Sequence, residues 1–391
     1  MIALRSRADT SALGRWFWTI DHWTLLAICT LICFGYVMML AASPAVAEHI
    51  GQSRDIFILK QMVFLAAAGV LTVAVSLLSL SGVRRLALVG CGVAFVLTVT
   101  TLVIGVQVKG ASRWIFLPGL SLQPSEFLKP FFAVTAAWLI SEQRRRPGFY
   151  GWVGAIVLAG MIVGVLKLQP DIGMLAVIVM VFFAQIFIAG VNLVIVCALA
   201  GLIAAAGVAA YSIFKHVRDR IDPFLSWSST EHYQVIRAKQ AFGAGGLTGR
   251  GPGEGRVKDV LPDAHADFVF AVTGEEFGLV VCSVIVVLFA FIVLRGLLRL
   301  LHEQDLFVIL AAGGLVTGFG LQAFVNMGST MGLLPTKGMT LPFISYGGSS
   351  VLAVAFGMGM LLALTRRRHG AGSAWNNNAG SAWSNNAGGA P

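Results

Sequence analysis

Long apolar runs recur along this chain, separated by short breaks that contain polar, glycine or proline residues. Most runs reach about 18 residues, the length that an α-helix needs to cross a hydrocarbon core of ~30 Å. The runs lack the strict alternation of a membrane-spanning barrel, so they favour helices. The chain is 57% hydrophobic and only 12% charged, with a mean hydropathy of +0.83. This composition leaves too few polar groups for a water-soluble globule, and the sequence predicts an all-α integral membrane protein.

The apolar runs predict about ten transmembrane helices. Their ranges are 22–42, 62–82, 86–106, 127–140, 150–168, 172–189, 193–214, 268–294, 306–326 and 349–365. The fourth and fifth ranges are the least regular, because Glu126 and Lys129 lie at the start of one and Lys167 near the end of the other. Ionisable groups at that depth are costly unless they face a cavity.

Thirteen arginines lie at the ends of predicted spans or in the segments flanking them. They are Arg5, Arg7, Arg15, Arg84, Arg85, Arg144, Arg145, Arg146, Arg295, Arg299, Arg366, Arg367 and Arg368. Basic residues collect on the cytoplasmic side of a membrane, so both termini are expected in the cytoplasm. The formal charge of +10 is spread over these short clusters, which argues against a nucleic-acid partner.

The predicted organisation has three parts. A cytoplasmic segment covers residues 1–20, and a membrane domain covers 21–368, with a large outer loop at 215–267 between spans seven and eight. Residues 369–391 contain an eight-residue Trp/Asn repeat that predicts a disordered cytoplasmic tail. The five cysteines fall within apolar spans without metal-ligand spacing, so no metal site is assigned to them.

Four segments of unusual composition are predicted to converge on the outer face. They are KGASRWIFLPGLSLQPSEFLK (109–129), LQPDIG (168–173), the end of the 215–267 loop, and LPTKGMTLPFISYGGSS (334–350). Arg113 and Lys129 offer positive charge to an anionic group, although Glu126 and Lys129 are also spaced as an ordinary i,i+3 ion pair. Asp171 has the alternative role of a turn-forming residue.

A glycine-rich stretch, GAGGLTGRGPGEG (243–255), has seven glycines in thirteen residues but no phosphate-loop pattern. Its glycines are expected to let the backbone pass close to a ligand or bend at the bilayer surface. Just before it, residues 231–242 have the spacing of a short helix lying in the membrane interface.

Carboxylates gather in LPDAHADFVFAVTGEEFG (261–278). Asp263 and His265 fall on the water side, Asp267 at the junction, and Glu275 and Glu276 two turns deeper. Asp267 could serve simply as a helix N-cap. The group as a whole indicates a polar cavity, where a partly desolvated carboxylate beside other acids suits a general base.

These motifs resemble the SEDS family of shape, elongation, division and sporulation proteins, over roughly residues 20–368. The TKG of LPTKGMTLPFISYGG and the GRGPGEG before LPDAHADF are more similar to the FtsW branch than to the RodA branch. Ala266 departs from the family pattern, which commonly has Thr there, and the Trp/Asn tail has no counterpart in the family.

The resemblance implies a glycosyltransferase that joins lipid II units into β-1,4 glycan strands with inversion, during septal division. Asp267 would be the catalytic base. The implied substrate-binding set is Arg113, Glu126, Lys129, Asp171, Glu275, Glu276, Lys337 and Ser345. Implied partners are lipid II, membrane lipid, a class B penicillin-binding protein and other division proteins; no cofactor is certain, and a divalent cation, Mg²⁺ or Mn²⁺, remains a candidate.

Three alternatives stay open at this point. A RodA-type elongation polymerase would use the same motifs. A flippase could use the acids and lysine at membrane depth, but it would need reactive groups at both faces and shows no two-half inverted repeat. A scaffold that only recruits division proteins would leave the buried acids unexplained.

Overall fold

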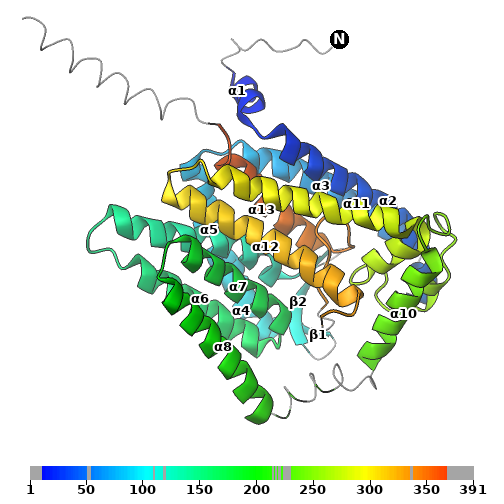
Figure 1. Ribbon diagram of the computed structural model, residues 1–391. Helices are drawn as coiled ribbons and strands as arrows, with labels where there is room; N and C mark the ends of the chain where they lie inside the picture. The colour runs from blue at the N-terminus through cyan, green and yellow to red at the C-terminus, as the bar shows by residue number, and fades with distance from the viewer. Residues whose placement is uncertain are drawn as a thin grey trace, which may run out of the picture.

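The computed structural model describes residues 11–50, 54–108, 111–117, 120–213, 215, 218, 222, 230–334 and 338–367. A bundle of long helices dominates it (Figure 1). The helices are α1 (Ala12–Thr19), α2 (His22–Ile50), α3 (Arg54–Ser76), α4 (Leu80–Ile104), α5 (Pro124–Arg145), α6 (Gly151–Leu168), α7 (Ile172–Ile188), α8 (Leu193–Ile213), α10 (Thr230–Gly245), the short 3₁₀ helix η1 (Val257–Val260), α11 (Val269–Leu300), α12 (Leu306–Thr330) and α13 (Gly348–Leu364).

Each of the ten predicted ranges contains a helix, and the mainly helical fold is confirmed. In the described part of the chain, six helices are long and apolar enough to cross a membrane, namely α2, α3, α4, α6, α11 and α12. The α7 and α13 helices are apolar but shorter. The exact number of spans therefore stays a prediction. The helix expected near 231–242 is present as α10.

Several predicted boundaries are wrong by more than a turn, among them the one between the second and third spans. Residues 62–82 were predicted as one span, but α3 ends at Ser76. The next helix begins at Leu80, because the Ser79 hydroxyl accepts the backbone N–H of Gly82 as an N-cap. The apolar side chains around residue 78 hid this turn from a reading based on hydropathy. Arg84, assigned to a loop, lies in the first turns of α4.

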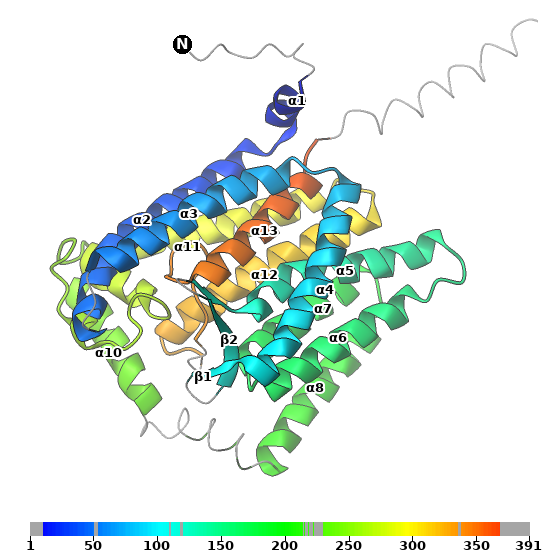
Figure 2. The ribbon, with the colours of Figure 1, turned by 180° about the vertical axis from the view of Figure 1, so that it is seen from behind.

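A small antiparallel sheet joins α4 to α5, which the all-α prediction missed. Its strands are β1 (Val106–Val108), β2 (Ala111–Leu117) and β3 (Leu120–Leu122), in the order β1-β2-β3. Val106 pairs with Trp114 and Ile115 pairs with Leu122, with a bulge next to Val106. The strands are too short to stand out against the apolar runs, and Figure 2 shows β1 and β2 at one end of the bundle.

The α5 helix lies at the centre of the bundle and packs on α4, α6, α7, α12 and α13. It begins with Pro124 at its first position, where the missing N–H costs nothing. Gln185 of α7 is fully buried and donates to the carbonyls of Ala133 in α5 and Leu310 in α12. The Gln185 side chain therefore links α7 to the central helix α5 and to α12.

Most of the predicted span-end arginines that the structure describes meet at one end of the bundle, here called the arginine end. Arg145 pairs with Asp305 of the α11–α12 turn at 3.0 Å, and Arg84 lies 4.0 Å from Glu142 of α5. The backbone N–H of Arg367 donates to the Thr19 carbonyl at the end of α1. Arg5, Arg7 and Arg368 lie outside the described residues.

The α11 helix is broken at Gly278, whose φ is 76°. Residues 246–251 of the glycine-rich stretch lie along the break and restore its backbone bonding. Leu279 N–H donates to the Gly246 carbonyl, and Arg250 N–H donates to the Glu275 carbonyl. A β carbon at Gly278 would lie 2.4 Å from Gly249 N and from Leu247 O. The glycines therefore allow close approach to another backbone, whereas a nearby ligand or bending at the bilayer surface was predicted.

Candidate active site

A cavity of about 650 Å³ opens at the end of the bundle opposite the arginine end. This volume lies in the range of small-molecule sites, about 300–1,000 Å³. All four segments singled out in the sequence contribute to its walls, and the predicted convergence is present. The lining residues include Lys60, Arg113, Trp114, Ser121, Glu126, Asp171, Asp263, Ala266, Asp267, Gly338, Thr340, Tyr346 and Ser350.

Asp267 is half-buried in the wall of this cavity. It lies in a tight turn in which the Asp263 carbonyl accepts the N–H groups of Ala266 and Asp267, at 3.0 and 3.1 Å. The Asp267 carbonyl accepts a bond from the Asn326 amide of α12 at 3.0 Å. The N-cap of α11 is Phe268, with no side-chain cap, so the alternative in which Asp267 is that cap is wrong.

Gly338 gives the opposite wall room to approach this carboxylate. Its φ is +59°, and a β carbon there would lie 3.3 Å from Asp267 Oδ2. The Asn326 amide donates to the Met339 carbonyl as well as to the Asp267 carbonyl, so one side chain links the backbones of the two facing walls. This arrangement fixes the carboxylate at the cavity wall, and a rigid surrounding shell is what a catalytic group requires.

Arg113 of β2 lines the cavity, and its side chain contacts the α6–α7 turn. Its Nη2 donates to the Pro170 carbonyl at 2.9 Å, and its Nη1 lies 3.5 Å from Asp171 Oδ2. The other Asp171 oxygen caps α7 by accepting the N–H of Met174. Burial raises the pKa of the Asp171 carboxyl above its ordinary value, and the Arg113 charge offsets this only in part. Asp171 therefore has a structural role and lines the cavity too.

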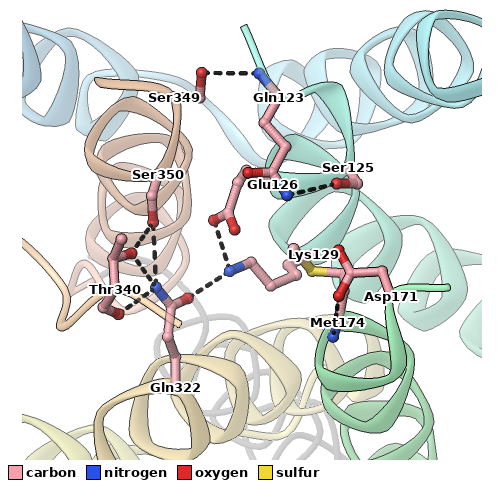
Figure 3. A network of polar contacts seen from close by, with 10 residues as sticks. All are labelled: Gln123, Ser125, Glu126, Lys129, Asp171, Met174, Gln322, Thr340, Ser349 and Ser350. Carbon is pink, nitrogen blue, oxygen red and sulfur yellow. Dashed lines mark hydrogen bonds and ion pairs between the residues drawn. The ribbon is translucent and has the colours of Figure 1, made fainter. Parts of the chain in front are cut away.

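Glu126 and Lys129 form the ion pair that their spacing predicts, at 2.8 Å. Lys129 also donates to Gln322 of α12, whose amide in turn donates to Thr340 and Ser350 (Figure 3). Glu126 lines the main cavity, whereas Lys129 lies below it against a small void of about 40 Å³. Lys129 is thus directed toward Glu126 and Gln322, away from the cavity interior.

Glu275 and Glu276 lie outside the cavity lining. The Glu275 carboxylate accepts three backbone N–H groups, at Arg256, Val257 and Lys258. Glu276 accepts from the Gly253 N–H and pairs with the buried ammonium of Lys258. Both glutamates therefore hold the glycine-rich stretch and η1 against α11. They therefore support the segment that leads to Asp267 without lining the cavity themselves.

Ser345 is another predicted site residue that lies apart from the cavity lining. Ser345 is fully buried, and its hydroxyl accepts the backbone N–H of Leu341 at 2.8 Å, which closes the turn before α13. Lys337 lies outside the described residues, and its predicted role stays a prediction.

Sequence reasoning missed Lys60, Trp114 and Tyr346 in the cavity wall. Lys60 is exposed on α3. Its one signal in the sequence was a cation at the start of an apolar run, two residues before the predicted span. Tyr346 packs against His265 with tilted rings whose centroids are 5.2 Å apart. Nothing in local sequence could place these residues beside Asp267.

A divalent cation would need several His, Cys, Asp or Glu side chains close together as ligands. Among the described residues, no group of three or more His, Cys, Asp or Glu side chains could hold a metal ion. The described side chains therefore do not form a closed metal site.

A family model for the FtsW, RodA and SpoVE proteins, described as "Cell cycle protein", matches residues 22–370. The chain belongs to this family. The family match covers every helix from α2 to α13, together with all the segments that line the cavity.

Relatives at high coverage agree with this assignment. The proteins named "Probable peptidoglycan glycosyltransferase FtsW" from Caulobacter vibrioides and Geobacter sulfurreducens are 41% and 37% identical, over 367 and 358 residues. The first match covers 94% of each chain, and the second covers 89% of this chain and 95% of the relative.

Solved structures of family members share the fold. A chain of a peptidoglycan synthase complex, described as coordinating polymerization and crosslinking, matches with a TM-score of 0.74 at 26% identity, covering 88% of this chain and 97% of that one. The rod shape determining protein RodA of Thermus thermophilus matches with a TM-score of 0.64 at 25% identity, covering 90% of this chain and 98% of that one.

Proposed function

We propose that this protein is an FtsW-type peptidoglycan glycosyltransferase that polymerises lipid II. One observation carries the proposal: a half-buried carboxylate, Asp267, shares the wall of a 650 Å³ cavity with the cations Arg113 and Lys60. Base and cations in one cavity suit a reaction that removes a proton at one point and develops negative charge at another. The relatives named peptidoglycan glycosyltransferase support peptidoglycan as the polymer that is made.

The reaction begins at the 4-hydroxyl of the acceptor's GlcNAc. Asp267 takes the hydroxyl proton while the oxygen attacks C1 of the donor's MurNAc. The new C1–O bond forms as the bond to the α-linked diphosphate breaks, and the lipid diphosphate leaves with the bonding electrons. Attack from the opposite side gives a β-1,4 linkage and inverts the anomeric centre. The proton on Asp267 then passes to water, which restores the base.

The departing diphosphate needs fixed positive charge. Arg113 is held by the Pro170 carbonyl and by Asp171, so its guanidinium needs no reordering when charge develops. Lys60 is exposed in the same wall and contributes a point charge. Lys129 acts indirectly, by holding Glu126 and Gln322 in place.

The test is reconstitution of the full chain with purified lipid II, alone and with its class B penicillin-binding protein partner. Glycan strands that a muramidase digests to disaccharides are the expected product. Lipid II that crosses the bilayer without polymerising would support the flippase alternative, and no change in either assay would support a scaffold. The RodA-type alternative would make the same product, so localisation to the septum or the side wall separates the two roles.

Replacing Lys60 by Gln should lower kcat/KM for lipid II roughly 10- to 100-fold, since a hydrogen bond to a charged group is worth about 1.5–3 kcal/mol. Arg113→Gln should have an effect of the same size. Lys239→Gln is the matched control, because Lys239 is exposed on α10 and does not line the cavity. Polymerisation by Lys60→Gln at the rate of Lys239→Gln would exclude Lys60 from the diphosphate site.

The cavity is proposed to open on the outer face of the cytoplasmic membrane, with the arginine end and both termini in the cytoplasm. Cysteine labelling of cells checks this orientation at Ser228→Cys in the predicted outer loop and Ser373→Cys in the tail, both outside the described residues. A membrane-impermeant maleimide should label the first and spare the second. Labelling of the tail cysteine in intact cells would reverse the orientation.

A further inference from the structure

A groove of about 940 Å³ opens at the arginine end, far from the catalytic cavity. It lies between the end of α11, the α11–α12 turn and the residues after α13. Its apolar wall includes Phe291, Leu294 and Leu298 of α11, which are 37%, 60% and 61% exposed. Its rim is cationic and consists of Arg295, Arg299, Arg366 and Arg367. The proposed polymerase chemistry uses none of these residues.

The rim arginines are held in place by other parts of the chain. Asp21, at the start of α2, accepts two hydrogen bonds from Arg295 at 2.7 and 2.8 Å and forms an ion pair with Arg299 at 2.9 Å. Arg299 also donates to the Thr365 carbonyl after α13, and Arg366 donates to the Leu78 carbonyl. Because a guanidinium carries five N–H donors, these bonds leave donors for a further anion. Figure 1 shows α1 next to the end of α13.

Positive charge exceeds negative charge around the groove. The acid in its lining is Glu303, whose Oε1 accepts the backbone N–H groups of Gln304 and Asp305 and is thereby held in the turn. Asp21 offsets one charge of the Arg295 and Arg299 pair. A neighbouring cavity of about 510 Å³ shares Arg366 and Arg367 and adds Arg15 of α1.

We propose that this groove binds an anionic phospholipid, with the phosphate at the rim arginines and an acyl chain along the apolar wall of α11. The exposed Phe291, Leu294 and Leu298 belong to a helix apolar enough to span the membrane, so lipid chains already surround this wall. A free phosphate would use only the rim, whereas a phospholipid uses both parts of the groove. Basic pockets between helices are known to bind such head groups.

An orientation signal alone does not explain the groove. Arg84 and Arg85 serve orientation equally well at the same end, yet neither lines the groove. The rim arginines also connect three distant parts of the chain, through Asp21, Thr365 and Leu78. A bound phosphate would strengthen that junction between α2, α11 and α13.

The test is native mass spectrometry of the detergent-purified full chain, titrated with dioleoyl-phosphatidylglycerol or with dioleoyl-phosphatidylcholine. The phosphatidylglycerol should bind more tightly by about 30-fold or more. The Arg366→Gln/Arg367→Gln variant should lose about 30-fold for it, since each arginine near anionic lipid contributes roughly five-fold. The matched control is Arg84→Gln/Arg85→Gln, which removes the same charge at the same end.

Each remaining result overturns the proposal. Equal binding of the two lipids, or an equal loss in the Arg84/Arg85 control, would reduce the groove to generic surface charge. Displacement of the lipid by inorganic phosphate at the same concentration would make the ligand a free anion.

If the double variant has a lowered unfolding temperature, Arg367→Gln alone replaces it, because the Arg367 contact to Thr19 is made by its backbone. That variant should lose about five-fold, and unchanged affinity would contradict the site.

Discussion

Asp267→Asn should abolish most lipid II polymerisation, lowering kcat by about 10²-fold or more, which is the usual size of a general-base contribution. The amide keeps the shape of the carboxylate but cannot accept the acceptor's proton. The turn that carries Asp267 is built from backbone bonds, since the Asp263 carbonyl accepts the N–H of residue 267 and the carbonyl of residue 267 accepts from Asn326. These bonds survive the substitution, so the protein should fold and bind lipid II normally.

Asp263→Asn is the matched control for this prediction. It removes the same charge from the same cavity wall, and asparagine tolerates the positive φ of 54° at this position. We expect at most a several-fold loss of polymerisation in this variant. Gel analysis of glycan strands, with lipid II binding measured in parallel, separates the two variants. Near wild-type strand synthesis by Asp267→Asn would remove Asp267 from the role of base.

The helices were predictable because membrane thickness imposes one length on every span. Hydropathy therefore gave ten ranges that each contain a helix, including α5 with its Glu126 and Lys129. The break at Gly278 was not predictable in the same way. It depends on the backbone of residues 246–251 lying against α11, and a contact between segments that are distant in sequence leaves no periodic pattern.

The candidate site was predictable at the level of segments more than of side chains. Asp267, Arg113, Glu126 and Asp171 do line one cavity. Which lysine reaches it was decided by packing: Lys129 lies on the α5 face that meets Gln322, whereas Lys60 lies on an exposed part of α3. Glu275 and Glu276 were predicted to need a polar cavity or a cation. Glu276 has such a cation in Lys258, whereas Glu275 accepts three backbone N–H groups.

Lys258→Met should destabilise the protein by about 3–5 kcal/mol, because removing one partner of a buried ion pair leaves the other charge uncompensated. The side chains of Lys258 and Glu276 are 5% and 0% exposed. Lys258 also donates to the Ala41 carbonyl of α2 and to the Gly253 carbonyl. The substitution therefore frees both the glycine-rich stretch and the contact between η1 and α2. Thermal unfolding of the purified protein in detergent measures the loss.

Glu276→Gln combined with Lys258→Met completes a double-mutant cycle that tests the cause. The glutamine keeps an oxygen for the Gly253 N–H and carries no charge, so the double variant should be more stable than Lys258→Met alone. The exposed pair of Arg145 and Asp305, at 3.0 Å with side chains 53% and 22% exposed, is the control and should contribute at most about 1 kcal/mol. Strictly additive losses at Lys258 and Glu276 would show that packing, and not the buried charge, holds the glycine-rich stretch against α11.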